Sequence, residues 1–300
     1  MENRGLGPNE ILFPLLRGLY PYIPETAKVL VDRIPVLRSV LRQLVRVALG
    51  GKGDVCEGRL NGHLFLAPLD FAGFFFVGEY EPETATAFLE CIRPGDIVID
   101  VGSYIGVYAL LAARCVGADG KVICFEPDPK NFELLTRNIK TNGYSNIEPV
   151  MSAISDEKGA GLLHGRGSST WSLVERKKAK APEEERVCLT TSIDEYFRET
   201  QVDKSRVGAV KIDVEGFEMK VLRGMSSLIN SPQPLTVVCE INPSLLGAAG
   251  TQPTDILDLL EGHGFDVRSS TAQGSHGVLE EIGGLRPGSG VNVIFRRPVG

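Results

Sequence analysis

The feature that most constrains the fold is a regular alternation of short apolar runs and helical patterns that begins near residue 94. The apolar runs that we expect to be strands are 97–101, 122–125, 147–154, 207–214, 235–241, 265–268 and 291–296. The helical patterns between them are 104–116, 131–141, 217–229 and 256–262. Alternation of this kind is typical of an α/β domain, in which helices flank a mostly parallel sheet. The sequence therefore predicts a Rossmann-like architecture.

Changes in composition along the 300 residues predict three regions. Residues 1–52 carry eight Lys and Arg against four Asp and Glu, and we expect a basic helical N-terminal extension. Residues 53–93 are expected to form a β-rich hairpin, placed at the Phe-rich stretch 64–80, and then a lead-in helix. Residues 94–300 are expected to form the α/β domain, with a less regular insertion around 159–206.

Within the extension, residues 36–49 have the pattern of an amphipathic helix. Apolar residues recur at helical spacing on one stripe, and Arg38, Arg42 and Arg46 lie on another. One interpretation is that the apolar stripe packs on the α/β domain or on a second copy in a homo-oligomer. The other is a peripheral contact with an anionic membrane surface. The sequence leaves both open.

Overall composition excludes some classes of protein. The net charge of −6 argues against a nucleic-acid-coating protein, because that function needs a strongly basic face. The sequence has neither a long uncharged apolar stretch nor the apolar core of a secretory signal, so we expect a cytoplasmic protein. The six cysteines are scattered without the close pairing of a zinc site, and we expect no metal centre.

The first predicted strand ends in a tight glycine turn that begins at Asp100. Gly102 lets the backbone turn and approach a ligand, and Gly106 allows close helix–strand packing. The Gly-x-Gly-x-x-Gly pattern of a pyrophosphate-binding turn is absent, and a carboxylate stands in its place. A cofactor with positive charge and no phosphate, such as S-adenosylmethionine, fits these residues. We expect Asp100, Gly102, Ser103 and Gly106 to bind it.

The second predicted strand ends in Phe125-Glu126-Pro127. A carboxylate about 20 residues beyond a glycine turn can accept hydrogen bonds from both ribose hydroxyls of a nucleotide. We therefore add Glu126 to the cofactor-binding residues. NAD and S-adenosylmethionine share this requirement, so Glu126 alone does not distinguish them.

Several of these residues together resemble the FkbM-type family of methyltransferases. The resemblance extends from about Glu79 to Ile241, and its most specific part is the Asp-x-Glu-Gly element at 213–216. It is carried by Asp100 to Gly106, Phe125 to Pro127, Asn138, Asn142, Lys211 to Glu218 and Leu222-Arg223-Gly224. The chain departs from the family at Gly102-Ser103-Tyr104, where Gly-Ala-Asn is usual.

The resemblance implies a class I methyltransferase fold and S-adenosylmethionine as the methyl donor. The acceptor it implies is a hydroxyl oxygen of a sugar or other glycan, a polyketide or a similar small metabolite. Two alternatives remain at this point. An NAD-dependent oxidoreductase would share the fold and Glu126, and a sensor would bind S-adenosylmethionine without turnover.

Methyl transfer to an alcohol needs a group that takes the hydroxyl proton. Asp213 and Glu215 are the candidates, because two residues apart on an extended chain they would project to one side. Paired carboxylates raise one another's pKa, and Glu240 at the next strand end could join them. The alternatives are that these acids cap the next helix, pair with Lys211, or hold Mg²⁺ together with Asn242. His164 is a further candidate base.

Overall fold

The computed structural model describes residues 55–165, 171–175, 184–269 and 271–298. Its contacts divide the chain into two compact units. The first unit comprises Met1–Pro82 with Lys140–Gly143, and the second comprises Glu83–Ile139 with Tyr144–Gly300. The predicted amphipathic helix at 36–49 lies outside the described residues, so both of its interpretations stay predictions.

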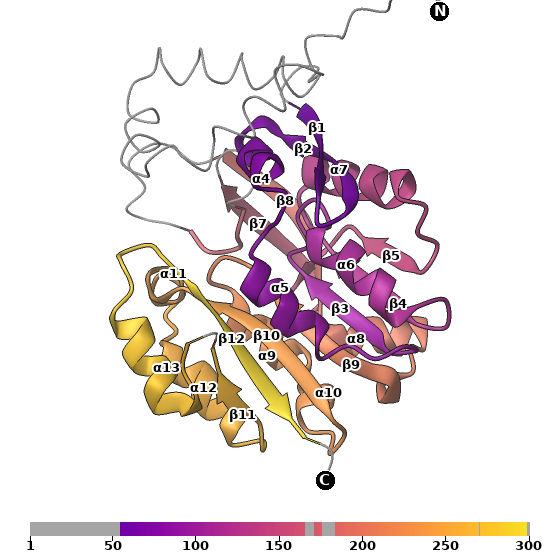
Figure 1. Ribbon diagram of the computed structural model, residues 1–300. Helices are drawn as coiled ribbons and strands as arrows, with labels where there is room; N and C mark the ends of the chain where they lie inside the picture. The colour runs from indigo at the N-terminus through magenta and orange to yellow at the C-terminus, as the bar shows by residue number, and fades with distance from the viewer. Residues whose placement is uncertain (1–54, 166–170, 176–183, 270, 299–300) are drawn as a thin grey trace, which may run out of the picture. The chain divides into compact units, whose positions relative to one another are not determined.

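The second unit is built on a seven-stranded sheet with the order β11-β12-β10-β9-β3-β4-β5 (Figure 1). Its strands are β3 (Ile97–Val101), β4 (Lys121–Phe125), β5 (Ile147–Val150), β9 (Val207–Ile212), β10 (Leu235–Ile241), β11 (Asp266–Arg268) and β12 (Val291–Arg297). Only β12 runs antiparallel to its two neighbours, β10 and β11. The expected class I fold, with a mostly parallel sheet, is confirmed.

Helices cover both faces of this sheet, because the strand order extends from β3 in one direction and from β9 in the opposite direction. They are α5 (Pro82–Leu89), α6 (Val107–Val116), α7 (Pro129–Thr141), α8 (Ile193–Thr200), α9 (Glu218–Gly224), α10 (Ser226–Ile229), α11 (Pro243–Ala248), α12 (Pro253–Glu261) and α13 (Gly274–Gly283). One buried cluster joins Ile99 and Val210 of the sheet to side chains of α8, α9, α10, α12 and α13. The α6 helix contacts β3, β4 and β5. Since side chains alternate along a strand, Asp100 lies on the face opposite to Ile99.

The insertion around 159–206 is more regular than we expected. It holds β7 (Gly159–Gly165) and β8 (Glu184–Thr191), which pair antiparallel, followed by α8 and the short helix η3 (Lys204–Arg206). The third predicted strand splits, because after β5 the chain enters β6 (Ala153–Ile154), which pairs with β8 instead of the large sheet. His164 lies in β7 and exchanges backbone hydrogen bonds with Ser172, so it is not a loop residue.

Three further boundaries differ from the prediction for local reasons. The helix expected from 104 begins at Val107, because Gly106 has a left-handed backbone at its N-cap. The helix expected at 217–229 divides into α9 and α10 around Met225, whose ψ is 30°. The strand expected at 207–214 ends at Ile212, so the acids that follow it leave the extended conformation.

The first unit contains the predicted hairpin, at a different position. It is formed by β1 (Val55–Leu60) and β2 (His63–Pro68), which pair antiparallel. The Phe-rich stretch after it is helical, with η2 (Leu69–Phe71) and α4 (Ala72–Val77), so its assignment to the hairpin is wrong. The Gly78 C-cap, with φ of 84°, ends α4 in a left-handed conformation.

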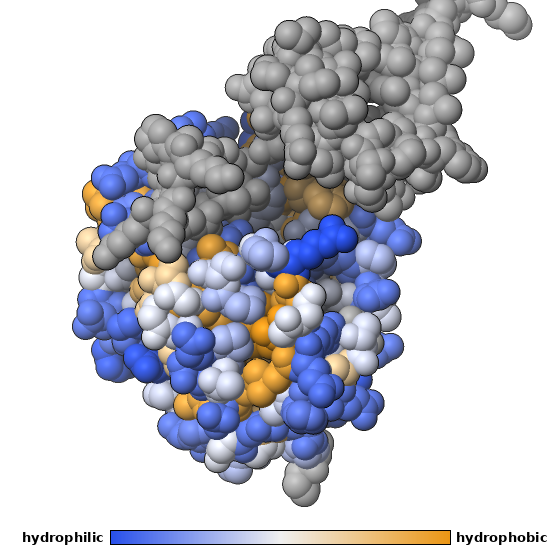
Figure 2. Space-filling model, turned by 90° about the vertical axis from the view of Figure 1, so that its left-hand side faces the viewer, coloured by the Kyte–Doolittle hydropathy of each residue, from blue (hydrophilic) through white to orange (hydrophobic). Residues whose placement is uncertain are grey.

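The face on the left of Figure 1, which includes α11 and α13, has hydrophobic residues near its middle and hydrophilic residues around them (Figure 2). This distribution is typical of helices that bury one side only, as α13 does with Val278 and Ile282. None of the helices in the described residues is both long and apolar enough to cross a membrane.

Candidate functional site

The candidate site lies where the two central parallel strands, β3 and β9, end side by side. The chain continues from β3 to β4 on one side and from β9 to β10 on the other. In sheets of this kind ligands bind beyond the carboxyl ends of the strands at such a switch point. The register places Asp100 of β3 beside Lys211 of β9. The Lys211 Nζ atom lies 4.5 Å from the ring centre of Tyr108 in α6, so this pair is on the α6 face.

The two predicted glycines shape the turn between β3 and α6. Gly102 and Gly106 have φ angles of +82° and +91°. A Cβ atom at Gly102 would overlap the carbonyl oxygen of Asp213, and one at Gly106 would lie 2.6 Å from Leu135 of α7. Gly102 therefore lets the turns after β3 and β9 approach each other. Gly106 permits close packing of α6 on α7, whereas we expected helix–strand packing.

Ser103 and Tyr104 complete this turn. The Ser103 hydroxyl donates a hydrogen bond to the Asp100 carbonyl at 2.8 Å, so its side chain stabilises the turn itself. Tyr104 has a φ of 50°, in the left-handed region where Asn is enriched among residues other than glycine. A bulky residue such as Tyr104 adopts this conformation only with backbone strain. A contact of Ser103 with the cofactor stays a prediction.

The two asparagines in the resemblance stabilise their surroundings within each unit. In the second unit, Asn138 Nδ2 donates to the Ile105 carbonyl at 2.9 Å and holds the glycine turn against α7. In the first unit, Asn142 accepts the Leu64 N–H at 3.0 Å and donates to the Leu64 carbonyl at 2.7 Å. Both amides satisfy backbone groups that would otherwise lack partners.

Asp100 is a buried carboxylate, with 2% of its surface exposed. Burial raises its pKa to about 6, although the Lys211 ammonium opposes the shift, so Asp100 is ionised at neutral pH. Within the described part of the chain, its Oδ2 atom is buried and has no hydrogen-bond partner. A buried, unpartnered carboxylate oxygen is costly, and it fits a ligand that brings a cation or a hydrogen-bond donor.

Glu126 is also buried and connects the end of β4 to the glycine turn. Its oxygens accept the Tyr104 N–H at 2.8 Å and the Asp128 N–H at 2.9 Å. Burial raises the pKa of Glu126 to about 8. Each carboxylate oxygen can accept more than one hydrogen bond, so the geometry is compatible with the predicted ribose contacts.

A neighbouring cluster, which the sequence did not indicate, links the insertion to the end of β4. Asp128 caps α7 by accepting the N–H groups of Lys130 and Asn131, each at 3.0 Å. It also forms an ion pair with Arg186 of β8, whose guanidinium lies 3.9 Å from the ring centre of Trp171. The insertion is thereby held close to Glu126. Local patterns could not reveal this, because the pair joins residues far apart in the chain.

Directly after β9, Asp213 lies between a buried cation and a second acid. The Lys211 Nζ atom donates to Asp213 Oδ2 at 2.9 Å, so the predicted alternative of pairing with Lys211 is observed. Lys211 is 2% exposed, and its charge lowers the pKa of Asp213. Burial and the Asp213 charge raise the pKa of Glu240 to about 9, and the two carboxyl groups share a hydrogen bond. The two shifts run in opposite directions, which favours the proton of the pair on Glu240 and the charge on Asp213.

Glu215 lies on a turn, so the expectation of an extended chain is wrong for it. Its φ is 58°, and the following Gly216 has a φ of 104°. The Ser172 hydroxyl donates to the Glu215 carbonyl at 2.8 Å, which connects this turn to the insertion. The Glu215 charge also contributes to the raised pKa of Glu240, so Glu215 belongs to the same group of acids.

Glu218 stabilises this turn, a role that the sequence analysis did not assign. It is 2% exposed and accepts the N–H groups of Gly216 at 3.0 Å and Val214 at 3.3 Å. Burial raises its pKa to about 7. The N-cap residue of α9 is Phe217, whose side chain has no group that could cap the helix, and Glu218 accepts the N–H groups just before it.

The sequence left open that Asp213, Glu215, Glu240 and Asn242 hold Mg²⁺ together. Among the described residues, no group of three or more His, Cys, Asp or Glu side chains is placed to hold a metal ion. Asn242 caps α11, where its Oδ1 atom accepts the N–H groups of Ser244 at 3.2 Å and Leu245 at 3.4 Å. Its carbonyl group is therefore engaged within the fold.

A class I fold with buried acids at the ends of its first and second parallel strands, and a half-buried acid at the end of its fourth, is typical of a methyltransferase with a nucleoside cofactor. Comparison with known families supports this class: the methyltransferase FkbM domain matches residues 100–267, more than half of the chain. The chain belongs to the FkbM methyltransferase family. The family uses S-adenosylmethionine, so the expected cofactor is confirmed and the NAD-dependent alternative is not.

Characterised relatives agree with this assignment. The hexuronic acid methyltransferase AglP of Haloferax volcanii is 29% identical over 185 residues, which cover 60% of this chain and 67% of the relative. The 31-O-demethyl-FK506 methyltransferase FkbM of Streptomyces tacrolimicus is 29% identical over 205 residues, covering 59% and 75%. Among solved structures, an S-adenosylmethionine-dependent O-methyltransferase of Thermotoga maritima is 17% identical with a TM-score of 0.42, covering 74% of this chain and 66% of its own. The family assignment does not depend on that structural likeness.

Proposed function

We propose that this protein transfers the methyl group of S-adenosylmethionine to a hydroxyl oxygen of a sugar, polyketide or similar small acceptor. Two observations support this. One relative is named as a hexuronic acid methyltransferase, and another as a 31-O-demethyl-FK506 methyltransferase. The acids near the site also provide a proton acceptor, which an alcohol requires as its oxygen attacks the methyl carbon.

In this proposal Asp100 and Glu126 bind the cofactor. Asp100 offers a buried charge and an unpartnered oxygen to the cationic end, and Glu126 accepts hydrogen bonds from the ribose hydroxyls. The bound cofactor supplies an electrophilic methyl group on a sulfonium. The turn at Gly102 and Gly106 positions both acids along one edge of the crevice.

The observation that carries the mechanism is the grouping of Lys211, Asp213 and Glu240. Asp213 is ionised because Lys211 stabilises its charge, whereas Glu240 already holds a proton. Asp213 is therefore the member of the pair that can accept the acceptor's proton while the new O–CH₃ bond forms and the C–S bond breaks. Glu215, which belongs to the same group of acids, is the second candidate base.

The test compares three carboxamide variants in a turnover assay with hexuronic acids and 31-O-demethyl-FK506 as acceptors. Asp213→Asn should lower turnover by roughly 10²–10⁴-fold, the usual contribution of a positioned base. Glu240→Gln should retain most activity, because the amide can still donate to Asp213. If Glu215→Gln causes the loss instead, Glu215 is the base.

The matched control is Asp258→Asn, which changes an exposed acid of α12 and should leave turnover unchanged. S-adenosylhomocysteine affinity and thermal unfolding should be measured for every variant, because Asp213→Asn also removes the charge that balances buried Lys211. Cofactor binding with no product from any hydroxyl acceptor would contradict the proposal and favour a sensor.

A further inference from the structure

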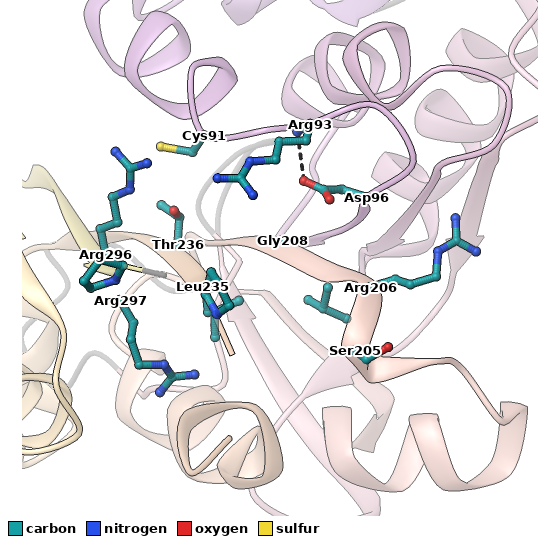
Figure 3. Close-up of a pocket in the computed structure, with 13 residues that line it drawn as sticks. Cys91, Arg93, Asp96, Ser205, Arg206, Gly208, Leu235, Thr236, Arg296 and Arg297 are labelled. Carbon is teal, nitrogen blue, oxygen red and sulfur yellow. Dashed lines mark hydrogen bonds between the residues drawn. The ribbon is translucent and has the colours of Figure 1, made fainter. Parts of the chain in front are cut away.

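A second pocket lies at the opposite edge of the large sheet, where β9 and β10 begin (Figure 3). It has a volume of about 160 Å³ and is lined by residues from the α5–β3 connection, the starts of β9 and β10, and the end of β12. Since β9 has six residues, this edge is roughly 15–20 Å from the carboxyl ends, at about 3.3 Å per residue. A ligand here cannot react with a methyl donor at those ends.

The lining of this pocket is strongly basic, although the chain as a whole is acidic. Four arginines, Arg93, Arg206, Arg296 and Arg297, line it together with one carboxylate, Asp96. The chain carries a net charge of −6, so this concentration of positive charge is local. Like charges gathered around one concavity repel one another unless an anion occupies it.

Two of these arginines are held by the fold. The Arg206 guanidinium donates to the carbonyls of Gly95, at 2.7 Å, and Asp119. The Arg297 guanidinium donates to three carbonyls at the end of α10 and beyond it, and it lies 4.5 Å from the ring centre of Phe265. Carbonyl groups satisfy their N–H donors without neutralising their charge, so both still contribute a positive potential.

The other two guanidinium groups are available. Within the described residues, Arg93 and Arg296 have exposed side chains with no hydrogen bond or ion pair. Asp96 accepts the backbone N–H of Arg93 at 2.8 Å, and Asp266 is opposite Arg296 in the β11–β12 register without pairing with it. Arg93 and Arg296 are planar hydrogen-bond donors that the neighbouring carboxylates do not bind. Both side chains are therefore suited to binding a different anion.

The strands contribute polar groups between these arginines. Thr236 is opposite Arg296 in the register and is 4% exposed, and Figure 3 shows it beneath the two free guanidinium groups. The β3–β9 ladder shifts by one residue between Ile97 and Val98, and Gly208 is left out of the pairing. Such bulges are common beside binding sites, because they release backbone groups from the ladder.

We propose that this pocket binds the phosphate group of a small soluble molecule, at a site separate from methyl transfer. Arg93 and Arg296 bind its oxygens from two sides, and Thr236 donates a hydrogen bond from the strand. Arg206 and Arg297 supply positive potential from fixed positions. A phosphorylated metabolite bound here would contact β9 and β10, whose other ends carry Asp213 and Glu240, so the site is suited to an effector.

The experiment titrates inorganic phosphate into the full-length protein, with chloride at matched ionic strength as the reference. Phosphate should raise the melting temperature above the chloride value, because it binds the folded state only. In NMR spectra the amide signals of Gly208 and Thr236 should shift, whereas that of Tyr104 should not. The double variant Arg93→Ala/Arg296→Ala should weaken phosphate binding at least tenfold.

The matched control is Arg223→Ala/Arg286→Ala, which removes two exposed arginines outside the pocket and the same total charge. It should bind phosphate as the wild type does. The proposal fails if chloride stabilises the protein as much as phosphate does. It also fails if the control weakens binding as much as the pocket variant, since general surface charge would then explain the effect.

Discussion

The charged residues at the two ends of the large sheet differ in sign and in burial. At the carboxyl end most of the ionisable groups are acids that lie inside the fold: Asp100 and Glu126 are buried, and half-buried Asp213 pairs with buried Lys211. At the amino end they are arginines, of which Arg93 and Arg296 are exposed and unpaired within the described residues. The carboxyl end is therefore part of the folding core. At the amino end, Arg206 and Arg297 are bonded to backbone carbonyls, whereas Arg93 and Arg296 can change at little cost to the fold.

The largest difference between the two ends of the sheet should be seen in stability, when one glycine at each end is changed to alanine. Gly102→Ala should destabilise the protein by about 3–5 kcal/mol, because its Cβ meets a backbone carbonyl at a positive φ. Gly208→Ala should cost less than about 1 kcal/mol, since its Cβ meets the movable Asp96 carboxylate. Urea denaturation measures both values. Equal losses would contradict the comparison.

A smaller effect concerns cofactor affinity. Glu126→Ala should weaken S-adenosylhomocysteine binding by about 2–3 kcal/mol, because hydrogen bonds to two hydroxyls are lost. Arg93→Ala should leave this affinity unchanged. Calorimetry on both variants gives the result. Unchanged affinity in Glu126→Ala would mean that other residues hold the ribose.

The pH dependence of stability should sharpen the comparison further. The pKa of Glu126 is about 8 in the folded protein against 4.5 as a free group, so between these values the folded state holds a proton that the unfolded state has lost. Stability should therefore fall as pH rises from 5 to 8, by up to about 1.4 kcal/mol per pH unit for one such group. Glu126→Gln should flatten this slope, measured by urea denaturation across that range. A slope equal to that of the wild type would show that Glu126 does not titrate this way.

Much of the carboxyl end could be predicted from the sequence because its signals are local. Asp100 lies near the end of one apolar run and Glu126 directly follows another. The glycine turn is formed by consecutive residues. Strand boundaries at 97–101 and 235–241 matched the structure for the same reason. A buried parallel strand reads as a short continuous apolar run.

What could not be predicted depends on pairings across the chain. The sequence indicated that Glu240 could join the paired acids, but the opposite pKa shifts of Asp213 and Glu240 depend on where buried Lys211 lies between the strands. The positive φ of Glu215 depends on a turn that Glu218 and Ser172 hold from other elements. In β7 and β8, exposed apolar residues such as Val187 mixed with charged ones obscured the alternation expected of a strand.

The buried Lys211 has a consequence for charge balance during the reaction. With Asp100 and Asp213 ionised and Glu240 neutral, the three groups Asp100, Lys211 and Asp213 carry a net charge of −1. The sulfonium of a bound methyl donor brings this to electroneutrality. In the proposed reaction Asp213 gains a proton in the step in which the sulfonium charge disappears, so the charges of these three groups and the sulfonium sum to zero both before and after transfer. Such a site avoids the cost of creating an uncompensated charge in a low-dielectric interior.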